Sequence, residues 1–203
     1  MNEQTSLTRC PQAWCINLDK RPERLNEFMS QKIPFPVARF RGIEMSNGAL
    51  GCLTSHMEVM KLFGDGLNMI FEDDFMLVNK WMYVDKALMQ LPMNWHCLYL
   101  GAMLHQPLNR WSENVFQLRM GWACHGVIYN GRTIADEILK HSPAEIHGKW
   151  RNIDTWMAQE VQTNFNCFVI SPIVGVQRPG FSDNIHRYRN YDMIKKFNQM
   201  TGQ

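Results

Sequence analysis

The residues best suited to chemistry are three adjacent carboxylates, Glu72-Asp73-Asp74, which directly follow the apolar run Met69-Ile70-Phe71. If that run is a buried strand, Glu72 and Asp74 lie at its end, one residue apart, and can both turn toward one cation. Mg²⁺ and Mn²⁺ favour oxygen ligands and usually keep part of their shell for water and phosphate. We therefore expect Glu72 and Asp74 to hold Mn²⁺ or Mg²⁺ against a diphosphate. The alternative is a solvated acidic turn.

A basic segment, Lys20 to Arg24, also follows a short apolar run. Arg21 and Arg24 can contact phosphates or a nucleobase, and Asn17 can hydrogen-bond a base edge. Basic residues near a helix start do not complement the helix dipole, which favours a ligand role for them. The alternative is a charged helix N-terminus in which Glu23 is the ionic partner.

A third segment of interest runs from Gly48 to His56 and opens a predicted helix. Its two glycines, Gly48 and Gly51, permit close backbone approach and tight packing. Taken alone, His56 is more often a structural histidine of the core than a catalytic one.

The elements that must position these residues alternate between short apolar strands and amphipathic helices. This rhythm predicts an α/β domain with a largely parallel central sheet. Ligands of such sheets bind outside the carboxyl ends of the strands, where the three carboxylates fall. The predicted strands are 13–18, 37–40, 68–71, 97–100 and 167–171, with a β-rich stretch at 115–129. The predicted helices start at 22 and cover 46–63, 80–90, 131–141, 153–161 and 190–203.

The composition is that of one globular domain, with 203 residues, 45% of them hydrophobic and 20% charged. We therefore treat residues 1–203 as a single domain, with a core at about 13–183 and a C-terminal helix at 190–203. The net charge of +2 gives no argument for a nucleic-acid partner.

Nothing in the sequence predicts a membrane span, because no segment approaches the roughly 20 apolar residues that a spanning helix needs. The polar N-terminus lacks the apolar core of a signal peptide. The six cysteines are scattered and several lie in apolar runs, which is typical of buried free thiols in a reducing compartment. We expect a cytoplasmic protein, with peripheral attachment to a membrane allowed.

Three of these segments, taken in order, carry a family pattern. Ile16 to Arg24 resembles I-N-L-x-x-R-x-x-R, Gly48 to His56 resembles G-E-x-G-C-x-x-S-H, and Ile70 to Asp74 resembles an E-D-D block. The pattern is similar to that of glycosyltransferase family 25, which includes bacterial lipooligosaccharide galactosyltransferases and animal procollagen galactosyltransferases. One acid of the second block is replaced here by Ala49.

The resemblance continues more weakly toward the C-terminus. Trp95 to Gly101 resembles a W-D-x-x-Y-x-G strand in which His96 replaces the acid, and Ile153-Asp154 resembles an I-D pair before a late helix. Pro172 to Asp183 resembles the P…Q…S-D motif at the C-terminal end of the pattern in bacterial members. Together the segments cover about residues 13–183.

The resemblance implies a GT-A type nucleotide-diphospho-sugar fold and an inverting transfer, typically of galactose from UDP-galactose. The acceptor would be a hydroxyl of a glycan, a lipid-linked glycan or a protein. We place the contacts to the nucleotide-sugar at Asn17, Arg21, Arg24, Ser55, His56 and Asp73.

Inversion requires a base that takes the proton of the acceptor hydroxyl. Our candidate is Asp154. We expect it at the start of a helix, from which its carboxylate would point toward the ligand site at the carboxyl ends of the strands. The alternative is that Asp154 only caps that helix. Asp183 and His186 are the alternates for the base or for a late metal ligand.

Two other functions use similar residues. A metal-dependent phosphohydrolase or nuclease also clusters carboxylates at strand ends, although the sequence offers no second cluster of acids and histidines suited to two metals. A non-catalytic nucleotide-sugar or carbohydrate-binding module would keep donor binding without turnover. The replacements at positions 49 and 96 leave room for such a module.

Overall fold

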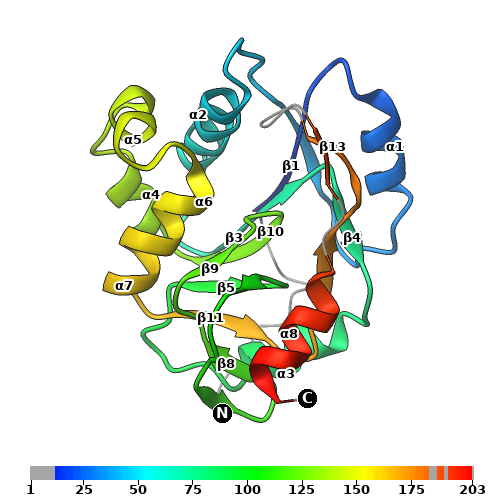
Figure 1. Cartoon of the computed structure of the whole chain (residues 1–203), viewed down its shortest axis with the longest axis vertical. Helices are drawn as coiled ribbons and strands as arrows, with labels where there is room; N and C mark the ends of the chain where they lie inside the picture. The colour runs from blue at the N-terminus through cyan, green and yellow to red at the C-terminus, as the bar shows by residue number, and fades with distance from the viewer. Residues whose placement is uncertain (1–11, 183–186, 190–191, 203) are drawn as a thin grey trace.

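The central feature of the fold is a mixed sheet of eight strands in the order β2-β1-β3-β10-β5-β11-β8-β7 (Figure 1). The computed structural model describes residues 12–182, 187–189 and 192–202. The strands of this sheet are β1 (Gln12–Asn17), β2 (Ala38–Arg41), β3 (Leu67–Glu72), β5 (Cys97–Tyr99), β7 (Arg110–Ser112), β8 (Val115–Gln117), β10 (Gly126–Asn130) and β11 (Cys167–Ile170).

The sheet contains the predicted parallel strands but is mixed, since three of its seven described strand pairings are parallel and four are antiparallel. β1 pairs in parallel with β2 and β3, and β5 pairs in parallel with β11. β10 lies between these two groups and is antiparallel to both β3 and β5, so all five parallel strands point the same way. β8 and then β7 add an antiparallel edge beside β11. The carboxyl ends of β1 and β3 therefore meet at one edge of the sheet.

Side chains that alternate along the strands build two hydrophobic cores, one on each face of the sheet. Ile70 of β3 joins the core that contains Leu53, while its neighbour Phe71 joins the core that contains Phe28 and Val84. Ile70 and Phe71 are fully buried, and burying such a side chain contributes about 1.5–3 kcal/mol. This double-sided burial explains why β3 reads as a continuous apolar run.

The helices cover the two faces unequally (Figure 1). One face carries α2 (Gly48–Met60), α4 (Thr133–Ile138), α5 (Pro143–Trp150), α6 (Ile153–Trp156), the π-helical turn η2 (Met157–Val161) and α7 (Gln162–Asn164). The other face carries α1 (Pro22–Met29) and α3 (Met82–Leu88). The C-terminal helix, α8 (Met193–Thr201), packs against the first core through Met193 and Phe197.

Three two-stranded sheets complete the described chain. They pair β4 (Phe75–Leu77) with β12 (Gly175–Gln177), β6 (Met103–Leu104) with β9 (Gly121–Trp122), and β13 (Gly180–Ser182) with β14 (Arg187–Arg189). The β4–β12 pair brings the segment after β11 next to the segment after β3. Gln177 thereby lies near the carboxylates at the end of β3.

Helix α2 begins where the sequence predicts, because the Asn47 side chain accepts a hydrogen bond from the Leu50 N–H at 3.1 Å and caps the first turn. Gly51 in that turn lies directly against the loop that follows β2. A Cβ atom at position 51 would come within 2.6 Å of the Ile43 carbonyl oxygen. The expected close backbone approach is thus present at Gly51.

We predict that Gly51→Ala destabilises the fold by about 1–3 kcal/mol, since the new methyl group must displace the backbone of the β2–α2 loop. Gly148→Ala is a matched control, because a Cβ atom at this helical position meets nothing within 4 Å. That change should stabilise the protein by about 0.5–1 kcal/mol. Urea unfolding monitored by circular dichroism measures both, and equal effects of the two substitutions would contradict the packing argument.

Candidate functional site

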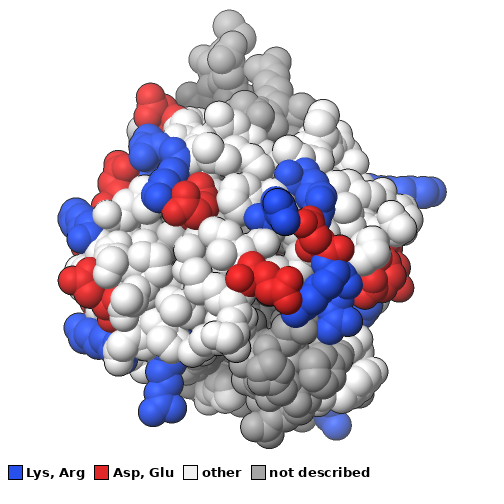
Figure 2. Space-filling view, turned by 90° about the horizontal axis from the view of Figure 1, so that it is seen from above, with Lys and Arg blue, Asp and Glu red and all other residues white. Residues whose placement is uncertain are grey.

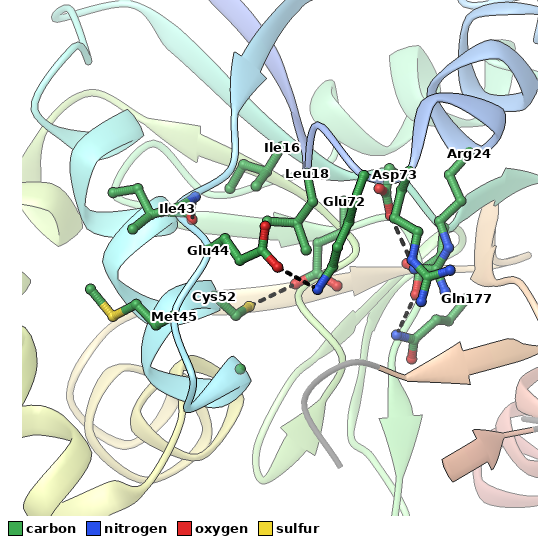
Figure 3. Close-up of a pocket in the computed structure, with 15 residues that line it drawn as sticks. Ile16, Leu18, Arg24, Ile43, Glu44, Met45, Cys52, Glu72, Asp73 and Gln177 are labelled. Atoms are coloured by element: carbon green, nitrogen blue, oxygen red, sulfur yellow. Dashed lines mark hydrogen bonds and ion pairs between the residues drawn. The ribbon is translucent and has the colours of Figure 1, made fainter. Parts of the chain in front are cut away.

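A pocket opens at the carboxyl ends of β1 and β3, between the loops that lead into α1 and α2 (Figure 3). It encloses about 860 Å³, including space open to solvent. It is lined by Ile16, Leu18, Lys20, Arg21, Arg24, Ile43, Glu44, Met45, Gly48, Cys52, Ser55, Glu72, Asp73, Asp74 and Gln177. The three carboxylates therefore share one pocket with three basic residues.

Asp73 is tied to the loop between β1 and α1. Asn17 Nδ2 donates to Asp73 Oδ2 at 2.8 Å, and Arg24 Nη1 lies 3.4 Å from Asp73 Oδ1. Asn17 is only 1% exposed, and its amide also donates to the Arg21 carbonyl and accepts from Arg39 Nε. Because its amide is committed to these partners and it does not line the pocket, Asn17 is placed to orient Asp73 instead of reading a base.

Arg21 and Arg24 both face the pocket, as expected from the sequence. Arg21 occupies the N-cap position of α1 and makes no side-chain cap, and its Nη1 atom lies 3.9 Å from Glu23 Oε1. That contact is at the outer limit of an ion pair. Lys20, which also lines the pocket, forms an ion pair with Glu44 at 2.8 Å.

Glu72 turns toward helix α2. Its Oε1 atom lies 3.0 Å from His56 Nε2 and 3.9 Å from Cys52 Sγ. Burial raises the pKa of Glu72 to about 8, and the charges of Asp154 and Asp73 add to the effect. Solvent reaches 21% of the Glu72 side chain, through the pocket, while protein surrounds the rest.

Asp74 turns the other way, toward β12. Gln177 Nε2 donates to Asp74 Oδ2 at 2.9 Å, and Asp74 Oδ1 is buried without a hydrogen-bond partner among the described residues. Burial, followed by the charge of Glu72, raises the pKa of Asp74 to about 8. Glu72 and Asp74 thus line one pocket with different protein neighbours. A cation between them would stabilise the ionised carboxylates, which burial and the neighbouring acids disfavour.

Ser55 and His56 lie on the buried side of α2. Ser55 Oγ donates to the Gly51 carbonyl at 2.7 Å and accepts from the Ile43 N–H at 2.8 Å, which fastens the β2–α2 loop to the helix. His56 is fully buried, and burial lowers its pKa to about 4, so the ring is neutral near pH 7. Ser55 lines the pocket, whereas His56 acts on it only through Glu72.

Asp154 lies in the first turn of α6, where the cap is Asn152. The alternative in which Asp154 is the N-cap is therefore wrong. Asp154 Oδ1 accepts from the Cys124 N–H at 2.8 Å. It does not line the pocket, but its charge is close enough to raise the pKa of Glu72.

The loop that holds Asp154 has an unusual backbone. Met120 has φ 53° and Ala123 has φ 85°, which are positive values that residues other than glycine rarely adopt. Buried Gln162 fixes this loop by accepting from the Gly121 N–H and donating to the Gly121 carbonyl. The other two candidates for the base, Asp183 and His186, lie outside the described residues.

The pocket also contains residues that the sequence analysis did not assign to a site, including Lys20, Glu44, Cys52 and Gln177. Cys52 had a usable signal, because it precedes His56 by four residues on a predicted helix and so shares a face with it. Gln177 sits within the C-terminal block of the resemblance. The Lys20–Glu44 pair joins two loops far apart in sequence, and no local pattern indicates it.

On the face seen in Figure 2, acidic and basic side chains are interspersed, with no broad patch of one sign. Among the described residues, no helix is long and apolar enough to cross a membrane. The five described cysteines are free thiols.

The site therefore lies where α/β domains bind their ligands, at the carboxyl ends of parallel strands, and it brings carboxylates and basic residues together there. The comparison with protein families identifies the class of protein. Residues 15–123 match the model of glycosyltransferase family 25, described as an LPS biosynthesis protein. The match covers more than half of the 203 residues, and the chain belongs to this family of glycosyltransferases. Its fold is of the GT-A type. No curated protein matches the chain.

The raised pKa values of Glu72 and Asp74 predict how the metal-free protein responds to pH. Both groups keep a proton in the folded state that the unfolded chain has lost above about pH 4–5, so stability falls as pH rises toward 8. His56 and His125, whose pKa values burial lowers to about 4, change stability only up to about pH 6.5. The window from pH 6.5 to 8 therefore isolates the carboxylates.

In the presence of a chelator, we expect the melting temperature to fall between pH 6.5 and 8 and to fall less in Asp74→Asn. A gain of 1 kcal/mol at pH 8 would correspond to about 2–4 °C in a chain of this size. Asp65→Asn, at an exposed aspartate before β3, should reproduce the native profile. Parallel profiles for native protein and Asp74→Asn would show that Asp74 is ionised in the folded state.

Proposed function

We propose that the chain transfers galactose from UDP-galactose to a hydroxyl of a glycan, a lipid-linked glycan or a protein, with inversion and with Mn²⁺ or Mg²⁺ bound. The observation that carries the proposal is the pocket at the end of β3, where Glu72, Asp73 and Asp74 face Lys20, Arg21 and Arg24. Family membership supplies the reaction class. Galactose and UDP come from the resemblance to the family's galactosyltransferases.

The carboxylates fit a hard divalent cation. They offer oxygen ligands, and the buried Asp74 Oδ1 atom has no hydrogen-bond partner among the described residues. Glu72 and Asp74 would hold the ion, while Asp73 stays fixed by Asn17 and Arg24. When bound, such an ion neutralises negative charge on a departing diphosphate.

The basic wall of the pocket suits the same diphosphate. Arg21 and Arg24 present guanidinium groups, which form strong hydrogen bonds to phosphate oxygens. Arg24 is already oriented by Asp73, so its side chain is partly ordered before any ligand binds. The Ser55 hydroxyl holds the loop that closes this side of the pocket.

In the proposed reaction, the acceptor oxygen attacks the anomeric carbon as the bond from that carbon to the UDP oxygen breaks. The acceptor's proton passes to a base, for which we keep Asp154, and UDP leaves with the electron pair. Asp154 accepts a hydrogen bond from the Cys124 N–H through Oδ1, and it lies close enough to Glu72 for its charge to raise the pKa of that carboxyl. Asp183 and His186 stay alternates for the base.

The structure weakens the main reason to consider a non-catalytic binding module. His96, which replaces an acid of the family pattern, lies just before β5, and its ring contacts Phe165 and the Asn166 N–H. Ala49 lies in the first turn of α2. Neither residue lines the pocket. A phosphohydrolase can be distinguished by its products, because it would hydrolyse its substrate when no acceptor hydroxyl other than water is supplied.

The proposal is tested first by thermal shift with UDP, with and without Mn²⁺. A ligand at about 100 times its Kd stabilises the fold by about 2.7 kcal/mol, which corresponds to roughly 5–10 °C here. We expect this shift only when Mn²⁺ and UDP are both present, and its loss in Asp74→Asn but not in the exposed control Asp65→Asn. A folded protein that responds to neither UDP nor any other nucleoside diphosphate would overturn the proposal.

The role of Asp154 is tested by Asp154→Asn, which keeps an oxygen that can accept from the Cys124 N–H. We expect kcat for galactosyl transfer to fall by about 10²–10⁴ while the KM for the donor changes little, because a base acts in the transition state. Asp136→Asn, an exposed aspartate on α4, should leave both constants unchanged. Similar losses in kcat and in donor affinity would make Asp154 a structural residue.

A further inference from the structure

The first turns of helix α2 carry two groups that bind metals through soft or nitrogen atoms. Cys52 and His56 are four residues apart, so they lie on the same face of the helix. That face points to the end of β3, where Glu72 Oε1 contacts both Cys52 Sγ and His56 Nε2. Figure 3 shows the contact between Cys52 and Glu72. One ligand atom from each of the three residues can be chosen so that all lie within 4.8 Å of one another.

We propose that Cys52, His56 and Glu72 form a binding site for a thiophilic divalent metal ion of the Zn²⁺ class. Tetrahedral Zn²⁺ with bonds of about 2.3 Å to sulfur and about 2.0–2.1 Å to nitrogen and oxygen separates its ligand atoms by roughly 3.3–3.6 Å. Here His56 Nε2 lies 3.0 Å from Glu72 Oε1, and Cys52 Sγ lies 3.9 Å from the same atom. The two separations that involve Glu72 are therefore close to those of a zinc site.

The proposed site has an entrance and an open coordination position. Cys52 and Glu72 both line the pocket, so an ion can reach them from solvent, while fully buried His56 closes the inner side. Three protein ligands with a fourth position facing a pocket are the arrangement of zinc sites that bind an exchangeable ligand. Of the described cysteines, Cys52 is the partly exposed one, whereas Cys15, Cys97, Cys124 and Cys167 are buried.

The donor set separates this site from the oxygen-ligated ion of the proposed function. A thiolate and an imidazole select Zn²⁺ and related ions over Mg²⁺ and Mn²⁺. Glu72 would belong to both sites, so the two ions compete for it. This competition rests on the proposed function, but binding of the thiophilic ion does not, since it depends only on Cys52, His56 and Glu72.

Co²⁺ reports directly on the proposed site, because it substitutes for Zn²⁺ and gives a thiolate-to-metal absorption band. We expect one Co²⁺ per chain of tag-free, metal-free protein, with this band, and loss of the band when Zn²⁺ is added. In Cys52→Ser the band should disappear and Zn²⁺ affinity should fall by about 100-fold or more, since even outer-shell changes cost about 10–100-fold. Glu72→Gln should weaken binding while keeping the band.

Cys10→Ser and His105→Ala are matched controls that keep the three ligands, and both should retain the band. Absence of the band in folded protein, or its persistence in Cys52→Ser, would overturn the proposed site. The outcome is separable from that of the UDP experiment. A cobalt band without any UDP response would leave the thiophilic site standing and reject the proposed function, and the reverse result would do the opposite.

Discussion

The repulsion among three adjacent carboxylates is the constraint on which the rest of the site depends. Each carboxylate is held by a different part of the chain: Asp73 by Asn17 and Arg24, Asp74 by Gln177, and Glu72 by helix α2. Like charges this close are tolerated only where protonation, a cation or hydrogen bonds compensate them. The end of β1, helix α1, helix α2 and the β4–β12 pair are consequently all anchored to one short segment at the end of β3.

Much of the fold was predictable because local patterns and tertiary burial agree. The apolar run at 68–71 is buried on both faces of the sheet, and Asn47 caps α2 as its residue type suggests. Helix α5 was missed, although Ser142 and Glu145 form a capping box that the sequence displays. The segment 153–161 is predicted as one helix, but a π-helical turn interrupts it after Trp156. Such turns have no clear sequence signal.

The pocket was predictable in part. The placement of Arg21, Arg24, Ser55 and the carboxylates follows from the rule that ligands bind at the carboxyl ends of parallel strands. The orientations of the Glu72 and Asp74 side chains were not predictable from the sequence. They depend on which side chains from distant parts of the chain pack beside them. Gln177 reaches Asp74 only because β12 pairs with β4, a contact across roughly a hundred residues that no local pattern encodes.

The positive φ values at Met120 and Ala123 show that the backbone of the loop beside Asp154 is strained. Residues other than glycine hold such a conformation at a cost of about 1–3 kcal/mol each, and they keep it only where surrounding contacts enforce it. Gln162, the first residue of α7, supplies that enforcement through its two hydrogen bonds to Gly121. The position of the Asp154 carboxylate, which accepts from the Cys124 N–H next to Ala123, is therefore set by a backbone conformation that only its surroundings maintain.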